Sequence, residues 1–228
     1  IIGASITVEP GGRLVLLVRD AAGWRSLCRL LTTANLAGEK ERPRLDLGTL
    51  AANAAGLTAL VGPGSEVAGR LLAGDGAGAR RALDGLRALF PATARGGPAA
   101  LWLELVDHLT SADRLRNRAL ATLAAETGVG VVATNMVAYA VPEDGPLHDV
   151  LAAVRHRTTV QAADRHLALN HEAYLKAADE MAALFAWQPQ ALANAGRVAE
   201  ACAFRLEAVA ERLPEFPLPP GETAYSYL

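Results

Sequence analysis

Short apolar runs alternate with segments of helical periodicity over the first 145 residues. Apolar or β-branched runs bounded by turn residues are typical of buried strands, and apolar residues three and four positions apart are typical of helices. The pattern predicts strands over 13–18, 56–61, 99–106 and 129–133, with another at the start of the chain. Strands and helices in alternation indicate βα units around a mostly parallel sheet, and so an α/β fold.

Polar residues mark where the predicted helices begin. Asp20 precedes a helix that contains Trp24 and Leu27, and aspartate is a favoured N-cap because its carboxylate accepts a hydrogen bond from the first turn. Further helices are predicted over 45–53, from 65 onward, over 75–90 and after the strand 99–106, the last with Leu115, Ala119 and Leu123 on one face. These helices supply the crossovers that parallel strands need.

The pattern changes at about residue 146, where helices replace the alternation. We predict helices over 147–154, 171–185 and 189–204, with a core stripe of Leu192, Ala195, Ala199, Cys202 and Leu206. Proline then dominates 213–221 and predicts a stiff, extended connector of the kind that leads to another domain. We therefore expect three parts, over 1–145, 146–212 and 213–228.

The composition excludes several classes of protein. Hydrophobic residues make up 51% of the 228 positions and charged residues 20%, which excludes a disordered or fibrous chain. The net charge of −2 excludes a basic nucleic-acid surface over the whole chain, although a local patch stays open. Cys28 and Cys202 both fall in apolar helical contexts, which favours a reduced, cytoplasmic protein.

The sequence contains no apolar run long enough to cross a membrane, and no secretory signal. It opens on Ile1 rather than methionine, in a segment that reads as a strand. We therefore expect a piece of a longer protein.

Motifs for catalysis are weak. The glycine-rich segment 74–79 resembles a dinucleotide-binding loop, but it follows a helical pattern instead of a strand, so we interpret it as a turn. His108 follows a strand and has carboxylates nearby, whereas the other four histidines read as surface residues. Arg114, Arg116, Arg118, Arg155 and Arg157 form local basic spots, which we interpret as solvated helix faces, with phosphate contact as the alternative.

Several segments, taken in order, are similar to a known family. They are 1–5 (IIGAS), 14–20 with Gly23 and Trp24, 27–32, 43–45, 103–108 (LELVDH), 132–139 (VATNMVAY), 147–155, 174–176, 180–181, 199–204, 213–217 and 221–223. Together they resemble the bacterial C-family DNA polymerases, the DNA polymerase III alpha-subunit family, and in particular its error-prone branch. The shared order makes this resemblance more specific than any single motif.

The resemblance implies a fold and a parent activity. Residues 1–145 would be the later part of a PHP domain, a distorted (β/α)7 barrel that is incomplete here, and 146–212 an all-helical lead-in. Residues 213–228 would connect to the polymerase palm, whose Mg²⁺-binding carboxylates lie outside this chain. The parent would be a DNA-directed DNA polymerase in replication and repair. Its partners would be primer-template DNA, dNTPs, and a sliding clamp or accessory damage-tolerance proteins; no membrane is implied.

The resemblance also marks the positions of the family's PHP metal ligands. The glutamate that follows the IIGA segment is Ser5 here, and an aspartate and a histidine of the TNDVHY segment are Met136 and Ala138. A thioether and a methyl group cannot replace a carboxylate and an imidazole around a hard divalent cation. Only His108 keeps a ligand-type side chain, so we expect a metal-free, structural PHP domain without catalytic residues of its own. DNA-binding residues are not assigned.

Two alternatives remain open from the sequence. One is an active PHP metal-dependent phosphoesterase, acting as a 3′–5′ exonuclease. The other is a free-standing barrel that binds proteins or sugar phosphates. Metal analysis separates the first from the structural interpretation, and the flanking coding sequence decides the second.

Overall fold

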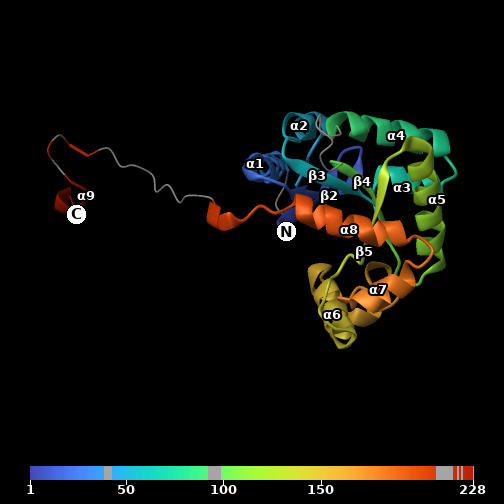
Figure 1. Ribbon diagram of the computed structural model, residues 1–228. Helices are drawn as coiled ribbons and strands as arrows, with labels where there is room; N and C mark the ends of the chain where they lie inside the picture. The colour runs from blue at the N-terminus through green and yellow to red at the C-terminus, as the bar shows by residue number, and fades with distance from the viewer. Residues whose placement is uncertain (39–42, 92–98, 209–217, 220, 222, 228) are drawn as a thin grey trace.

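The computed structural model describes residues 1–38, 43–91, 99–208, 218–219, 221 and 223–227 (Figure 1). Its centre is one sheet of five strands, in the order β1-β2-β3-β4-β5. The strands are β1 (Gly3–Val8), β2 (Gly12–Val18), β3 (Leu57–Val61), β4 (Leu101–Val106) and β5 (Gly130–Thr134). The predicted strands and the α/β class are confirmed, and the described sheet is open, with β1 and β5 at its edges.

The sheet is less parallel than the sequence suggests. The pairs β3–β4 and β4–β5 are parallel, but β1–β2 and β2–β3 are antiparallel. Only three residues separate β1 from β2, and so short a connection permits an antiparallel hairpin but no crossover. The expectation of a mostly parallel sheet is therefore wrong for its first half.

Helices cover the sheet on both faces. They are α1 (Ala21–Ala37), α2 (Leu47–Ala52), α3 (Glu66–Leu72), α4 (Gly76–Leu89), α5 (Ser111–Thr127), α6 (Gly145–Arg155), α7 (Ala178–Leu184), α8 (Pro189–Ala201) and α9 (Ala224–Tyr227). The main core holds Leu16, Leu103 and Leu105 together with Leu30 of α1. On the opposite face, Trp102 packs with Val198 of α8, the helix that crosses the sheet in Figure 1.

Side-chain caps fix where the first helices begin. Asp20 accepts a hydrogen bond of 2.9 Å from the amide of Gly23, and Ser65 and Asp75 cap α3 and α4 in the same way. The glycine-rich segment begins in the α3–α4 turn, in which Gly74 has a φ of +78°, and continues into the first turn of α4 from Gly76. It follows a helix, as the sequence indicates, and so lacks the strand that precedes a dinucleotide-binding loop.

The predicted helix over 171–185 is wrong in its first half, since α7 begins only at Ala178. Residues before it are extended, and Tyr174 pairs with Tyr139 in an isolated bridge. The amide of Asn135 donates to the carbonyl oxygens of Glu172 and Tyr174, at 2.9 and 2.7 Å. Those carbonyls are therefore not available to a helix.

Two predicted core stripes are displaced around their helices. Leu115 is exposed on α5, whereas Arg116 and Asn117 are buried. In the last stripe Cys202 is buried, but Ala199 and Leu206 are exposed. Cys28 is also exposed, against the apolar context expected for it.

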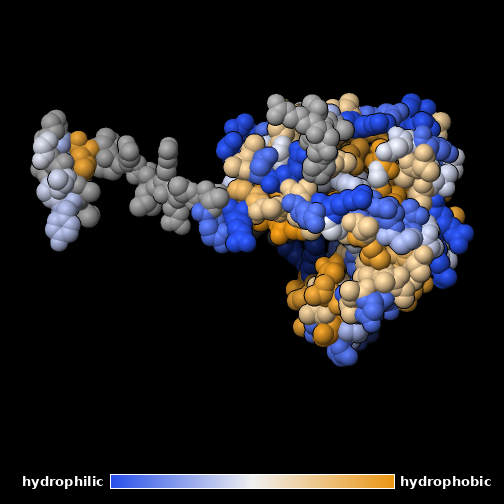
Figure 2. Space-filling view, in the orientation of Figure 1, coloured by the Kyte–Doolittle hydropathy of each residue, from blue (hydrophilic) through white to orange (hydrophobic). Residues whose placement is uncertain are grey.

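An exposed apolar stripe runs along α6 through Leu147, Val150, Leu151 and Val154. Figure 2 shows apolar side chains on the surface at this end of the protein. Among the described residues, no helix is long and apolar enough to cross a membrane. Most of the predicted connector 213–221 lies outside the described residues.

Candidate functional site at the carboxyl ends of the parallel strands

His108 is the second residue after β4, and its side chain joins the end of that strand to the end of β5. Its Nε2 lies 2.9 Å from the carbonyl oxygen of Asn135. A carbonyl oxygen only accepts hydrogen bonds, so Nε2 carries the hydrogen and its lone pair is not free. Asn170 donates to the carbonyl oxygen of His108 at 2.6 Å, and the carboxylate of Asp113 accepts from its amide at 3.1 Å. The residue therefore connects three segments.

Asn135 extends these connections. Its amide nitrogen binds the carbonyls of Glu172 and Tyr174, while its Oδ1 is buried and has no hydrogen-bond partner among the described residues. Lys176 cross-links the segment 172–176. Its ammonium donates to the Glu172 carboxylate at 2.7 Å and lies 3.6 Å from the centre of the Tyr174 ring. The loop after β5 is thus held firmly against residues 170–176.

The structure brings only some of the predicted site residues together. Met136 and Ala138 lie in the loop that His108 contacts through Asn135; Met136 has a φ of +41°, and the amide of Ala138 donates to Ala173. Ser5 lies on β1, and β2, β3 and β4 separate it from β5. Over the residues the structure describes, no three histidine, cysteine, aspartate or glutamate side chains form a group that could hold a metal ion.

The sequence interpretation missed a polar clamp at the end of β4. Arg116 and Asn117, both buried on α5, donate to the carbonyl oxygen of Val106 at 2.7 and 2.9 Å. Arg116 also binds Asp113 at 2.7 Å. The interpretation of Arg116 as part of a solvated face is therefore wrong. The sequence did contain a signal for this contact. Arg116 and Asn117 are hydrogen-bond donors in the helix that directly follows a buried strand, where they can reach the carbonyl groups at the end of that strand.

Opposing effects act on the Asp113 carboxylate in this clamp. Partial burial raises its pKa, but hydrogen bonds from Thr110 and Arg116 and the charge of Arg116 outweigh burial and lower the pKa below its ordinary value. The carboxylate therefore stays ionised and keeps its contacts.

The remaining histidines are not simple surface residues. His171 lies 2.9 Å from the carboxylate of Asp149, and the rings of His156 and His166 stack with their centres 3.7 Å apart. Burial, together with the charges of His156 and Arg165, lowers the pKa of His166. His148 packs against the ring of Tyr139. Expecting plain surface positions for all four is wrong for His148 and His171, which are half-buried, whereas His156 and His166 are exposed.

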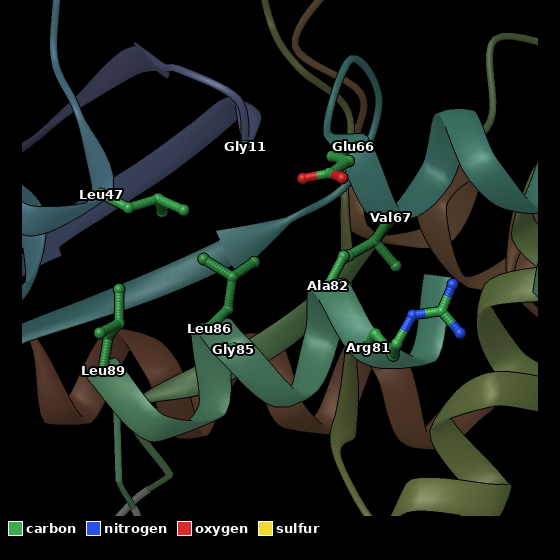
Figure 3. Close-up of a pocket in the computed structure, with 9 residues that line it drawn as sticks. All are labelled: Gly11, Leu47, Glu66, Val67, Arg81, Ala82, Gly85, Leu86 and Leu89. Carbon is green, nitrogen blue, oxygen red and sulfur yellow. The ribbon is translucent and has the colours of Figure 1, made fainter. Parts of the chain in front are cut away.

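An apolar pocket of about 220 Å³ lies between the β1–β2 turn and α2, α3 and α4. In Figure 3 the side chains of Leu47, Leu86 and Leu89 converge on it, while Arg81 points away. The carboxylate of Glu66 at its rim is bound by Arg70 at 2.8 Å. The pocket thus offers an apolar surface but no paired acid and base.

Comparison with known proteins extends over the whole chain. It is 39% identical to the error-prone DNA polymerase of Mycobacterium tuberculosis over its full length, and 40% identical to that of Mycolicibacterium paratuberculosis over 96% of it. The error-prone DNA polymerase of Rhodopseudomonas palustris is 35% identical, again over the full length. No protein-family profile matches the chain.

The aligned region is a limited part of these relatives. The chain spans 21% of the Mycobacterium tuberculosis protein and 19% of the Rhodopseudomonas palustris protein. Both the identity and the coverage of this chain agree with the resemblance carried by the segments 103–108 and 132–139. The chain is therefore similar, over 96–100% of its length, to error-prone DNA polymerases, of whose length it spans about a fifth.

Proposed function

We propose that this chain is part of an error-prone DNA polymerase that copies damaged templates in replication and repair. The observation that carries the proposal is the collinear similarity, at 34–40% identity, to relatives named error-prone DNA polymerase. The parent would act on primer-template DNA and dNTPs, with Mg²⁺ held by palm residues outside this chain. A sliding clamp or damage-tolerance proteins would be its partners, and the cytoplasm its location.

We further propose that residues 1–145 form the later part of a PHP-type barrel, that 146–212 are a helical lead-in, and that 213–228 connect to the palm. The parallel strands β3, β4 and β5, with α5 between the last two, support a barrel segment. The change from strands to helices after β5 supports the boundary near residue 145.

Within the parent, this part would be structural and would hold no catalytic metal. The side chains at the ligand positions do not fit a divalent cation, because Met136 offers a thioether and Ala138 a methyl group. His108 uses Nε2 to hold the Asn135 carbonyl, which supports a role in fixing the loop after β5. The site would then stabilise the polymerase body.

Primer extension by the full-length parent protein tests the polymerase proposal. We expect templated incorporation opposite an abasic site, dependent on Mg²⁺. A parent that extends no primer, on damaged or undamaged template, would contradict the assignment.

Elemental analysis of the same protein tests the structural role. We expect less than stoichiometric Zn²⁺ or Mn²⁺, and no change in it when His108 is replaced by alanine. Stoichiometric metal that His108→Ala removes, together with phosphodiesterase activity, would favour the 3′–5′ exonuclease alternative instead.

A further inference from the structure

A second hollow, of about 290 Å³, lies between the start of α5 and the turn that joins α7 to α8. Its lining combines Arg114 and Arg118 with Trp187, and Leu109, Ala183 and Leu184 add apolar surface. Asp107, directly after β4, is also part of the lining. The hollow thus lies next to the carboxyl end of a parallel strand, where α/β folds commonly bind ligands.

Two unpaired cations line this hollow. Arg114 and Arg118 are four residues apart, so they share one face of α5. Both are exposed, and neither guanidinium has an ion pair or a side-chain hydrogen bond within the described part of the chain. Of the neighbouring carboxylates, Asp113 is paired with Arg116. Asp107 accepts from the amide of Leu109 at 2.8 Å, which does not neutralise its charge, but the two arginines outnumber this one carboxylate in the lining.

The position of Arg114 makes the local potential more positive. It lies at the start of α5, where the free amides and the helix dipole already favour a negative charge. A cation there is unfavourable for the helix by itself. An anion placed between Arg114 and Arg118 would relieve that repulsion.

Trp187 adds an aromatic surface to the charged one. Trp187 is 45% exposed, although tryptophan is mostly buried in proteins, and it lies in the α7–α8 turn. An exposed indole beside arginines is the combination that binds single-stranded nucleic acid, because bases stack on the ring while cations hold the phosphates.

We propose that this hollow binds one nucleobase with its phosphates, as presented by single-stranded DNA, with the base on Trp187 and the phosphates on Arg114 and Arg118. The biological meaning rests on the proposed polymerase function, for which the bound strand would be template DNA. The contacts themselves do not rest on that function, and a free nucleotide would satisfy them as well.

Fluorescence anisotropy of the 228-residue chain with a labelled oligo(dT) of about 12 nucleotides tests the site. We expect the double variant Arg114→Ala/Arg118→Ala to weaken binding about tenfold, and to reduce the slope of log K against log salt by about 1.4, as loss of two phosphate contacts requires. Trp187→Ala should weaken binding about fivefold, while Trp187→Phe, which keeps a stacking ring, should retain it.

A matched control is available on α1. Arg25 and Arg29 are also exposed, four residues apart and without an ion pair among the described residues, but no exposed tryptophan accompanies them. Arg25→Ala/Arg29→Ala should leave binding within about twofold of the unchanged chain. Equal losses from the two arginine pairs would reduce the interaction to general charge attraction and overturn the proposal.

A second arm measures dTMP binding by quenching of tryptophan fluorescence. Binding of dTMP as tight as that of the oligonucleotide would assign the site to a free nucleotide, and much weaker binding would assign it to a strand. Absence of binding in both arms, or unchanged oligonucleotide binding in Trp187→Ala, would refute the site. That result would leave primer extension by the full-length parent unaffected, so the two failures are distinguishable.

Discussion

Glu104 is a buried carboxylate in the middle of the sheet, 3% exposed, and its surroundings predict a specific cost of mutation. Its Oε1 accepts from Thr134 at 2.7 Å, while its Oε2 lies 3.6 Å from the guanidinium of Arg13 and has no hydrogen bond among the described residues. Arg13→Ala would leave that charge unpaired, so we expect a loss of about 2 kcal/mol in the free energy of unfolding, measured with urea.

Arg44→Ala is the control for that prediction. The Arg44–Glu9 pair has a similar length, 3.3 Å, but its side chains are 66% and 61% exposed. Exposed pairs contribute little, so we expect a loss of about 0.5 kcal/mol or less. Equal losses from the two variants would show that burial of Glu104 does not determine the effect.

Tyr174 has the larger of the two pKa shifts found among the tyrosines whose side chains the structure describes. Its hydroxyl donates to Glu180 at 2.6 Å, and this hydrogen bond, with some burial and the nearby carboxylate charges, raises its pKa from 10.0 to about 12. At pH 11 about a tenth of Tyr174 should be ionised, as ¹³C NMR of the Cζ carbon would measure. In Glu180→Gln a larger fraction of Tyr174 should be ionised at the same pH than in the unchanged chain, because the carboxylate that holds the proton is gone.

The same hydrogen bond, together with one from the Ala177 amide, lowers the pKa of Glu180. A carboxyl group with a depressed pKa in the folded state contributes stability above its unfolded pKa and loses it as the pH falls through the folded pKa. Any stabilisation from Glu180 should therefore be lost as the pH falls below the ordinary pKa of glutamate and through the lowered pKa of the folded state. A Tyr174 titration unchanged by Glu180→Gln would contradict this assignment for both residues.

Among the helices, α8 makes a buried polar contact with the sheet. The buried amide of Asn194 donates to the carbonyl oxygen of Val131 in β5, at 2.7 Å. Because β5 is an edge strand, this side chain takes the place of a missing neighbour. Asn194→Ala should cost about 2 kcal/mol of unfolding free energy and speed hydrogen exchange in β5. Asn35→Ala, which removes an exposed bond to Leu31 within α1, should change neither.

Local signals predicted helix starts better than helix faces. Asp20 caps α1 through a contact three residues away, which a sequence displays directly. By contrast, Arg116 and Asn117 occupy the buried face expected for Leu115, because the carbonyl of Val106 at the end of β4 requires donors. Apolar spacing carries no information about such a partner, so the face was assigned wrongly.

Contacts between residues far apart in the sequence account for the other differences between the predicted and the observed structure. The segment before α7 has helical composition, yet Asn135, 37 and 39 residues away, binds its carbonyls and keeps it extended. The sequence did place His108 after a strand, with carboxylates nearby. It could not show that His108 donates to the Asn135 carbonyl, since that contact joins two loops 27 residues apart.

The protein as a whole depends on segments beyond residue 145 to complete its first part. Leu60, Trp102 and Val132 form a sheet face that is covered by Val198 of α8 and by Cys202, which follows the helix. Phe185, which follows α7 and is fully buried, belongs to the main core. Residues 1–145 expressed alone should therefore expose this apolar face and aggregate, as sedimentation velocity would measure.

Residues 1–208 serve as the control for this prediction. This piece retains α8, so its sheet face is covered, but it also carries the exposed α6 stripe of Leu147, Val150, Leu151 and Val154 that the shorter piece lacks. If exposed helix surface governed aggregation, 1–208 would be the worse of the two. Because an uncovered sheet also presents strand edges, we expect 1–145 to be worse. A cooperative, monomeric melt of 1–145 would show that the sheet and its first five helices form a core independent of α8.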